Sequence, residues 1–205
     1  MKQDDIIKEI GQIRSLMERS SKFLSISGLS GVLIGLYALV GAFAGYYTVY
    51  GFNSRFGYRD YYVTDSFVIY KLIAIAAAVL IVSLLTGWWM AHLKARNAGQ
   101  SIWNAASKSL LFAVGVPLLT GGLLSIILVL RGDYGMVASS LLIFYGLALC
   151  AGSTFTFKEI RWLGIFEIVL GLMALCLPGY GLWFWTIGFG ILHIVYGFIV
   201  HKRYE

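Results

Sequence analysis

The sequence predicts an all-α membrane protein of six transmembrane helices, arranged as three helical hairpins and preceded by an amphipathic cytoplasmic helix. Of the 205 residues, 59% are hydrophobic and 13% are charged, whereas a soluble domain is about 45–50% apolar and about 25% charged. With a mean hydropathy of +0.80, so short a chain cannot bury its apolar residues in a core of its own, and lipid must surround them. This composition excludes a soluble enzyme, a nucleic-acid-binding domain and a disordered tail.

Six apolar runs lie between the charged residues of a single transmembrane domain, 23–205. A helix needs about 20 residues to cross the hydrocarbon core, and backbone groups cannot go unpaired in lipid, so the runs must be helices rather than strands. The connections that follow the third and fifth runs are tight, which predicts antiparallel pairs. The predicted spans are 23–47, 67–93, 110–130, 135–157, 162–177 and 181–200.

Lysine and arginine are distributed unequally over the two sides that six spans define. The side of both termini holds twelve of the 16, and the other side holds only Arg55, Arg59, Lys71 and Arg131. Because cytoplasmic loops carry the excess of basic residues, both termini are predicted to lie in the cytoplasm, and the protein in a bacterial cytoplasmic (inner) membrane. Lys71 lies inside its span, so its ammonium group is expected to snorkel to the surface.

Residues 1–22 are predicted to form an amphipathic helix. Ile6, Ile10, Ile13 and Met17 recur at helical spacing, and the five basic residues beside this stripe suit an anionic membrane surface. The heptad-like seam also allows contact with a second copy or a partner protein. Packing on the membrane surface or on the bundle is favoured, because short helices are marginally stable by themselves.

The one long loop on the outer side, 48–66, interleaves aromatic residues with Arg55, Arg59, Asp60 and Asp65. Aromatic rings and arginine together are able to bind a sugar or another small ligand. An aromatic belt at headgroup depth explains the same composition more simply. We therefore expect the belt and keep the ligand as the alternative.

Glycines recur at a spacing of seven residues in four of the predicted spans. In the first, third and fifth spans, which cross in the same direction, leucine follows the second glycine, as a duplication of hairpins would require. Seven residues are about two turns, so each pair opens one helix face to close packing. The pairs are Gly28 and Gly35, Gly115 and Gly122, Gly164 and Gly171, and Gly190 and Gly197.

Glu167 and His193 are ionisable residues inside spans, where a charge is costly and points to a function. Both lie about 9–12 Å from the cytoplasmic side at 1.5 Å per residue, on adjacent spans, with Tyr196 and Tyr145 close enough to join them. One hypothesis is a proton-responsive pair that serves transport or pH sensing. The favoured interpretation is structural: either a hydrogen-bonded lock between two helices, since polar contacts commonly join helices in membranes, or a glutamate that snorkels toward the cytoplasmic surface.

Signatures of catalysis and of metal binding are missing from the sequence. It contains no zinc-protease, serine-hydrolase or nucleotide-binding motif. Its aspartates lie at the N-terminus and in outer loops, so they cannot form an intramembrane dyad. The two cysteines, Cys150 and Cys176, lack the spacing of a metal site. We therefore expect no catalytic residues, no metal, no cofactor and no nucleic-acid partner.

Several stretches resemble a group of uncharacterised six-span integral membrane proteins of Bacteroidota. The stretches are Met17-Glu-Arg-Ser-Ser-Lys-Phe, Ser27-Gly-Leu-Ser-Gly, Gly146-Leu-Ala-Leu, Arg161-Trp-Leu-Gly-Ile, Glu167 and Gly188-Phe-Gly-Ile-Leu-His-Ile-Val-Tyr-Gly. The glycine-spaced hairpins, especially 164–178, are also similar to the acid-resistance membrane protein family, another six-helix family. These resemblances imply the six-helix fold and carry over no activity and no catalytic residue.

The sequence thus favours a non-enzymatic protein with a regulatory, stress-related or scaffolding role. The main alternative is a small proton-linked transporter or channel that uses Glu167 and His193. A transporter needs a polar cavity that reaches the middle of the membrane, whereas a scaffold needs a packed bundle and an interface to a second copy or a partner protein.

Overall fold

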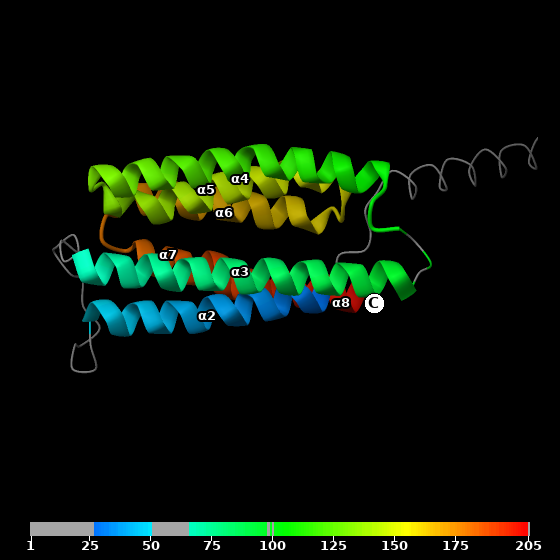
Figure 1. The fold of residues 1–205 in the computed structure, drawn as a ribbon, viewed down its shortest axis with the longest axis horizontal. Helices are drawn as coiled ribbons and strands as arrows, with labels where there is room; N and C mark the ends of the chain where they lie inside the picture. Colours follow the sequence, from blue (N-terminus) through cyan, green and yellow to red (C-terminus); the bar gives the residue numbers. More distant parts are fainter. Residues whose placement is uncertain (1–26, 51–65, 98, 100, 205) are drawn as a thin grey trace, which may run out of the picture.

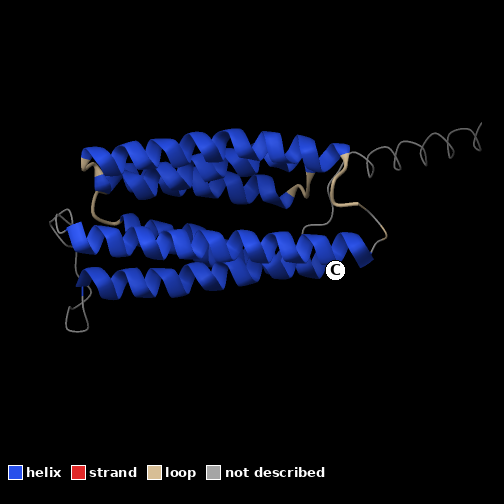
Figure 2. Cartoon of the chain, viewed as in Figure 1, coloured by secondary structure: helices blue, strands red, loops and turns tan. Residues whose placement is uncertain are grey.

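The computed structural model describes residues 27–50, 66–97, 99 and 101–204, and the part of the chain that it describes is helical with no strand (Figure 2). The predicted helix 1–22, the first residues of the first predicted span and most of the outer loop lie outside these residues. The elements are α2 (Gly28–Tyr50), α3 (Ser66–Asn97), α4 (Ala105–Arg131), η1 (Tyr134–Met136), α5 (Val137–Gly152), η2 (Ser153–Phe155), α6 (Glu159–Cys176), α7 (Gly181–Trp185), η3 (Thr186–Leu192) and α8 (His193–Tyr204).

Five helical segments among the described residues are long and apolar enough to cross a membrane. They are Gly28–Tyr50, Phe67–Asn97, Ala105–Arg131, Tyr134–Phe155 and Gly181–Tyr204. The other long helix, α6, has 18 residues and carries three acidic or basic side chains, Glu159, Arg161 and Glu167. It coincides with the fifth predicted span, which is also the shortest of the six.

Helix α4 shows how the sequence sets the ends of an element. Asn104 caps its start: the side chain of Asn104 accepts a hydrogen bond from the backbone of Ser107, and the Ser107 hydroxyl accepts one from the backbone of Asn104. This reciprocal arrangement satisfies backbone donors that the first turn leaves unpaired. At the other end Gly132 adopts a φ of 82°, a left-handed conformation that glycine reaches without steric cost.

The helices form two groups of three that lie side by side (Figure 1). One group contains α4, α5 and α6. The other contains α2, α3 and the last helix, which is built from α7, η3 and α8. The first two predicted hairpins, α2–α3 and α4–α5, each lie within one group. The predicted third hairpin is divided between the groups, because α6 packs mainly on α5 and α8 mainly on α2.

The seam between the groups is formed mainly by α5 and α6 on one side and the last helix on the other. Buried side chains gather in two apolar layers along it. One layer contains Phe157, Ile160, Leu163, Tyr196 and Val200, and the other contains Leu142, Ala174 and Phe184. On α6 the seam positions are Ile160, Leu163, Glu167, Leu170 and Ala174, which is the three-four spacing of one helix face. Glu167 is therefore the one acidic side chain in the middle of an otherwise apolar face of α6.

Candidate functional site

Tyr145, Glu167 and His193 meet in the seam, between its two apolar layers. The Tyr145 hydroxyl lies 2.7 Å from Nε2 of His193, and Nδ1 of His193 lies 3.5 Å from Oε1 of Glu167. Tyr145 belongs to α5 and Glu167 to α6, whereas His193 begins α8. The structure thus brings the two residues predicted as a pair into contact, and the contacts of His193 cross from one helix group to the other.

The hydrogen bonds of His193 define its tautomer. Nδ1 lies 3.0 Å from the carbonyl oxygen of Gly188, and a carbonyl only accepts, so Nδ1 must carry the hydrogen. In the neutral ring Nε2 is then the acceptor for the Tyr145 hydroxyl. Because both ring nitrogens are engaged, the orientation of the imidazole is fixed.

The carboxyl group of Glu167 is enclosed completely. Its side chain has no exposed surface, and within the described residues neither of its oxygens has a hydrogen-bond partner. A Cβ atom at Gly188 would lie 2.5 Å from Oε2 of Glu167 and 2.6 Å from Cδ2 of Leu142, so the carboxyl group fits in its present position because residue 188 is glycine. A buried polar group that lacks a hydrogen bond is costly, which singles out this position for a specific role.

A π-helical segment, η3, places His193 on the seam. Its wider turn accommodates one additional residue relative to an α-helix. Phe184, Gly188, His193, Tyr196 and Val200 of the last helix are buried, and the step of five residues from Gly188 to His193 is the step of a π turn. A regular α-helix turns about 100° for each residue. Without the additional residue, the buried residues up to Gly188 and those from His193 onward could not both face the seam. Sequence periodicity did not reveal this segment, although Gly188 and Gly190 within it were a visible signal.

Aromatic rings surround the three polar side chains. The ring of Phe189 lies 5.1 Å from that of Tyr145 and 6.0 Å from that of His193, and its other neighbour is Trp185 at 5.5 Å. Tyr196, the second tyrosine considered with the pair, is buried in the apolar layer with Val200. Within the described chain its hydroxyl has no hydrogen-bond partner, so only Tyr145 is bonded to the histidine.

Six of the eight predicted packing glycines lie where helices touch. A Cβ atom on any of them would approach a neighbouring helix to 3 Å or less. Both tight helix pairs use this pattern. Gly28 and Gly35 of α2 face Gly197 of α8 and Gly190 of η3. Gly164 and Gly171 of α6 face Gly146 and Ser139 of α5.

Gly115 and Gly122 of α4 differ from the other six glycines. No atom of the described residues lies within 4 Å of a Cβ built on either. The third glycine pair therefore does not pack against another described helix, because α4 packs on α5 with a different face, where a Cβ at Gly121 would meet Phe144.

The remaining titratable residues do not gather around the site. Among the described residues no group of three or more His, Cys, Asp or Glu side chains could hold a metal ion. Cys150 is half-buried and Cys176 is exposed. Lys71 is exposed on α3 and its Nζ lies 4.4 Å from the centre of the Phe67 ring, one turn nearer to the end of that helix, as snorkelling requires.

Fold and site together define a helical bundle with membrane-length helices and a buried tyrosine–histidine–glutamate network between its two halves. Comparison with protein-family models, curated proteins and solved structures found no match for this chain.

Proposed function

We propose that the chain is a polytopic protein of a bacterial cytoplasmic membrane, that it crosses this membrane six times with both termini inside, and that its role is regulatory, stress-related or scaffolding rather than enzymatic. In this proposal the network of Tyr145, His193 and Glu167 is a polar lock that fixes the two helix groups in register. The observation that carries the proposal is that His193, buried in the seam on the last helix, contacts Tyr145 and Glu167 of the other helix group through its two ring nitrogens.

The surface of α6 supports a sixth span. Glu167 faces the protein with no exposed surface, whereas Trp162, Phe166, Val169 and Met173 are 64%, 52%, 47% and 46% exposed. The exposed side is thus apolar, as a lipid-facing side should be. Glu159 and Arg161 lie in the first turn, at the level where charged side chains can reach the membrane surface.

The orientation is tested by chemical accessibility in spheroplasts. Cysteine is introduced at Ser101, between α3 and α4, or at Asp133, between α4 and α5, after Cys150 and Cys176 have been replaced by serine. We expect a membrane-impermeant maleimide to label the cysteine at position 133 in intact spheroplasts and that at position 101 only after lysis. Labelling of both before lysis, or the reverse order, would contradict the proposed topology.

The lock is tested by its contribution to stability. Tyr145→Phe removes the hydroxyl bonded to His193, and such a bond in a membrane protein contributes about 0.6 kcal/mol on average and about 1.7 at most. The matched control is Tyr70→Phe, because Tyr70 is 70% exposed on α3. We expect the first variant to lower the free energy of unfolding in mixed micelles and the control to leave it unchanged. Equal values for the two variants would show that the hydroxyl locks nothing.

A specific observation also favours the alternative, a small proton-linked transporter or channel. Glu167, His193, Tyr145 and Tyr196 all carry exchangeable protons and lie in or beside the seam between two helix groups, where rocking motions of transporters occur. Proteoliposomes loaded with a pH-sensitive dye distinguish the two functions. The lock predicts no proton flux above that of protein-free vesicles. A flux that Glu167→Gln abolishes would establish the alternative, and a pH response of stability that Glu167→Gln leaves unchanged would eliminate a proton-responsive pair.

A further inference from the structure

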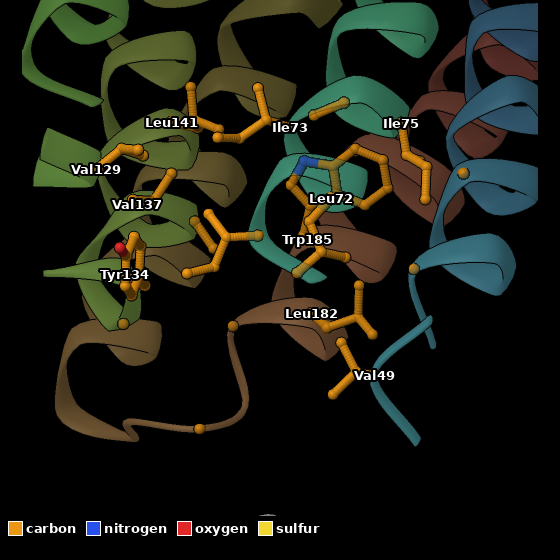
Figure 3. A pocket seen from close by; sticks show the side chains of 18 of the residues that line it. Val49, Leu72, Ile73, Ile75, Val129, Tyr134, Val137, Leu141, Leu182 and Trp185 are labelled. Atoms are coloured by element: carbon orange, nitrogen blue, oxygen red, sulfur yellow. The ribbon is translucent and has the colours of Figure 1, made fainter. Parts of the chain in front are cut away.

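A cavity of about 360 Å³ lies between α3 and the first half of α5 (Figure 3). It is found at the end of the bundle where α2, α4 and α6 terminate, which is opposite to the end with the C-terminus. Val129, Val137 and Leu141 line one side, and Leu72, Ile73 and Trp185 face them from the other. The connection from α6 to α7, with Pro178 and Gly179, lines the end of the cavity.

The packing of the helices explains why the cavity exists. The two helix groups meet along α5, α6 and the last helix, whereas α3 packs chiefly on α2 and α4 chiefly on α5. The residues that line the space between the groups include the small residues Gly45, Ala76 and Ala138. The space beside the seam is therefore left unfilled near this end.

The lining is chemically uniform. None of its residues is charged, and its side-chain polar atoms are the hydroxyls of Tyr50 and Tyr134 and the indole nitrogen of Trp185. The charged residues next to the lining along the chain are Lys71, directly before Leu72 and exposed over the Phe67 ring, and Arg131 and Asp133, which follow Val129 and are paired at 3.2 Å. A ligand for this cavity must be apolar over most of its length, with its polar end at the level of that ion pair.

The depth of the cavity fits within one leaflet. On α3 the lining extends from Ile69 to Ala76, about 10 Å of helix at 1.5 Å per residue, and one leaflet contributes about half of the roughly 30 Å hydrocarbon core. Ile73 lines the cavity and is 42% exposed, and Leu130 on α4 is 81% exposed. The cavity therefore opens sideways, between α3 and α4, on a surface that is itself apolar.

We propose that this cavity is a binding site for one acyl chain of a membrane phospholipid of the outer leaflet, which enters sideways between α3 and α4. Its headgroup lies at the level of Arg131. The chain is held between the two helix groups and is distinct from the lipids that cover the outer surface. This site is independent of the polar lock, and its assignment to the outer leaflet rests on the proposed orientation with both termini in the cytoplasm.

The test uses the full-length protein in vesicles of phosphatidylethanolamine and phosphatidylglycerol. A small fraction of the phosphatidylethanolamine carries a diazirine in the middle of one acyl chain, and the labelled residues are identified by mass spectrometry after irradiation. We expect label on Leu141, which is half-buried in the cavity, at least as strong as on Phe112, which is 75% exposed on α4. With the diazirine near the glycerol, the label should move from Leu141 to Val129 and Tyr134.

Matched variants complete the test. Ala76→Phe fills the cavity, whereas Ala78→Phe places the same ring on an exposed position of the same helix. We expect labelling of Leu141 to fall at least fivefold in the first variant and to stay unchanged in the second. The proposal is overturned if label follows surface exposure alone in the unaltered protein, or if both variants behave alike. It is also overturned if a second copy of the chain, crosslinked to the first, protects the residues of the cavity from label. The depth dependence in the unaltered protein decides the matter should Ala76→Phe not fold.

Discussion

Gly164 and Gly115 each begin a pair of glycines seven residues apart, yet the structure predicts opposite effects when they are replaced by alanine. A Cβ atom at Gly164 would lie 2.7 Å from the carbonyl oxygen of Gly146 and 3.0 Å from the backbone nitrogen of Cys150. Both are backbone atoms, which cannot move without the helix. A Cβ atom at Gly115 would meet nothing within 4 Å. Replacing each of these two glycines by alanine therefore tests the arrangement of the helices.

The magnitudes follow from these distances. An ordinary Cβ contact begins at 3.4 Å, so α5 and α6 must separate by about 0.7 Å at Gly164. Overpacking of this kind costs about 1–3 kcal/mol. At Gly115 the new methyl group meets no obstacle, and alanine exceeds glycine in helix propensity by about 0.8–1.0 kcal/mol. We expect Gly164→Ala to be destabilising and Gly115→Ala to be neutral or stabilising.

The free energy of unfolding of both variants is measured by reversible titration with a denaturing detergent in mixed micelles, followed by circular dichroism. Gly122→Ala serves as a second open-space control, since its Cβ would also meet nothing within 4 Å. Because the gain in helix propensity is common to both positions, the difference between the two variants measures the overpacking, and a difference below about 0.5 kcal/mol between Gly164→Ala and Gly115→Ala would refute the close approach of α5 and α6. A loss of stability in Gly115→Ala itself would show that this face of α4 packs against a helix.

Three further variants test other contacts. Gly188→Ala should destabilise by about 1–3 kcal/mol because its Cβ would press on Glu167 and on Leu142. The part of the loss that comes from Glu167 should disappear when Glu167→Ala is combined with it, and fully additive losses in the double-mutant cycle would argue against that contact. Glu159→Gln should cost less than about 1 kcal/mol, and less still in high salt, because its partner Arg203 at 2.7 Å has a 66% exposed side chain; an effect that salt leaves unchanged would contradict this. Asn104→Ala should cost about 1 kcal/mol by removing the cap of α4, and an unchanged unfolding midpoint would show the cap to be dispensable.

The membrane-length helices could be predicted because their signal is simple. Apolar runs bounded by charges locate spans through hydropathy, and the ends of α4 follow from Asn104 and Gly132, whose local chemistry is independent of the rest of the chain. The contact of Glu167 with His193 could also be predicted, because their depth follows from counting residues at 1.5 Å each.

The pairing of helices could not be predicted in the same way. A tight turn joins α6 to α7, yet α6 packs on α5 and α8 packs on α2. In lipid all apolar helix faces have similar solvation, so hydropathy does not identify partners. The pairs depend on close fits between backbones, for example at Gly146 and Gly164. Glycine spacing alone did not distinguish these positions from Gly115.

The similar solvation of all apolar helix faces in lipid also explains what the polar network contributes to the bundle. Because lipid competes with apolar side chains for contact, the two apolar layers of the seam bring the helix groups together with little preference for one register. The hydrogen bond between Tyr145 and His193 is directional, and a shift of one residue along the helix would move the hydroxyl by about 1.5 Å and break it. The π turn before His193 also favours this register, since it lets buried residues on both sides of the turn face the seam. A buried polar residue that specifies register at some cost in stability is well attested in helical assemblies. The hydrogen-bonded pair of Tyr145 and His193 fits that role, whereas Glu167, buried and without a hydrogen bond among the described residues, contributes mainly to the cost.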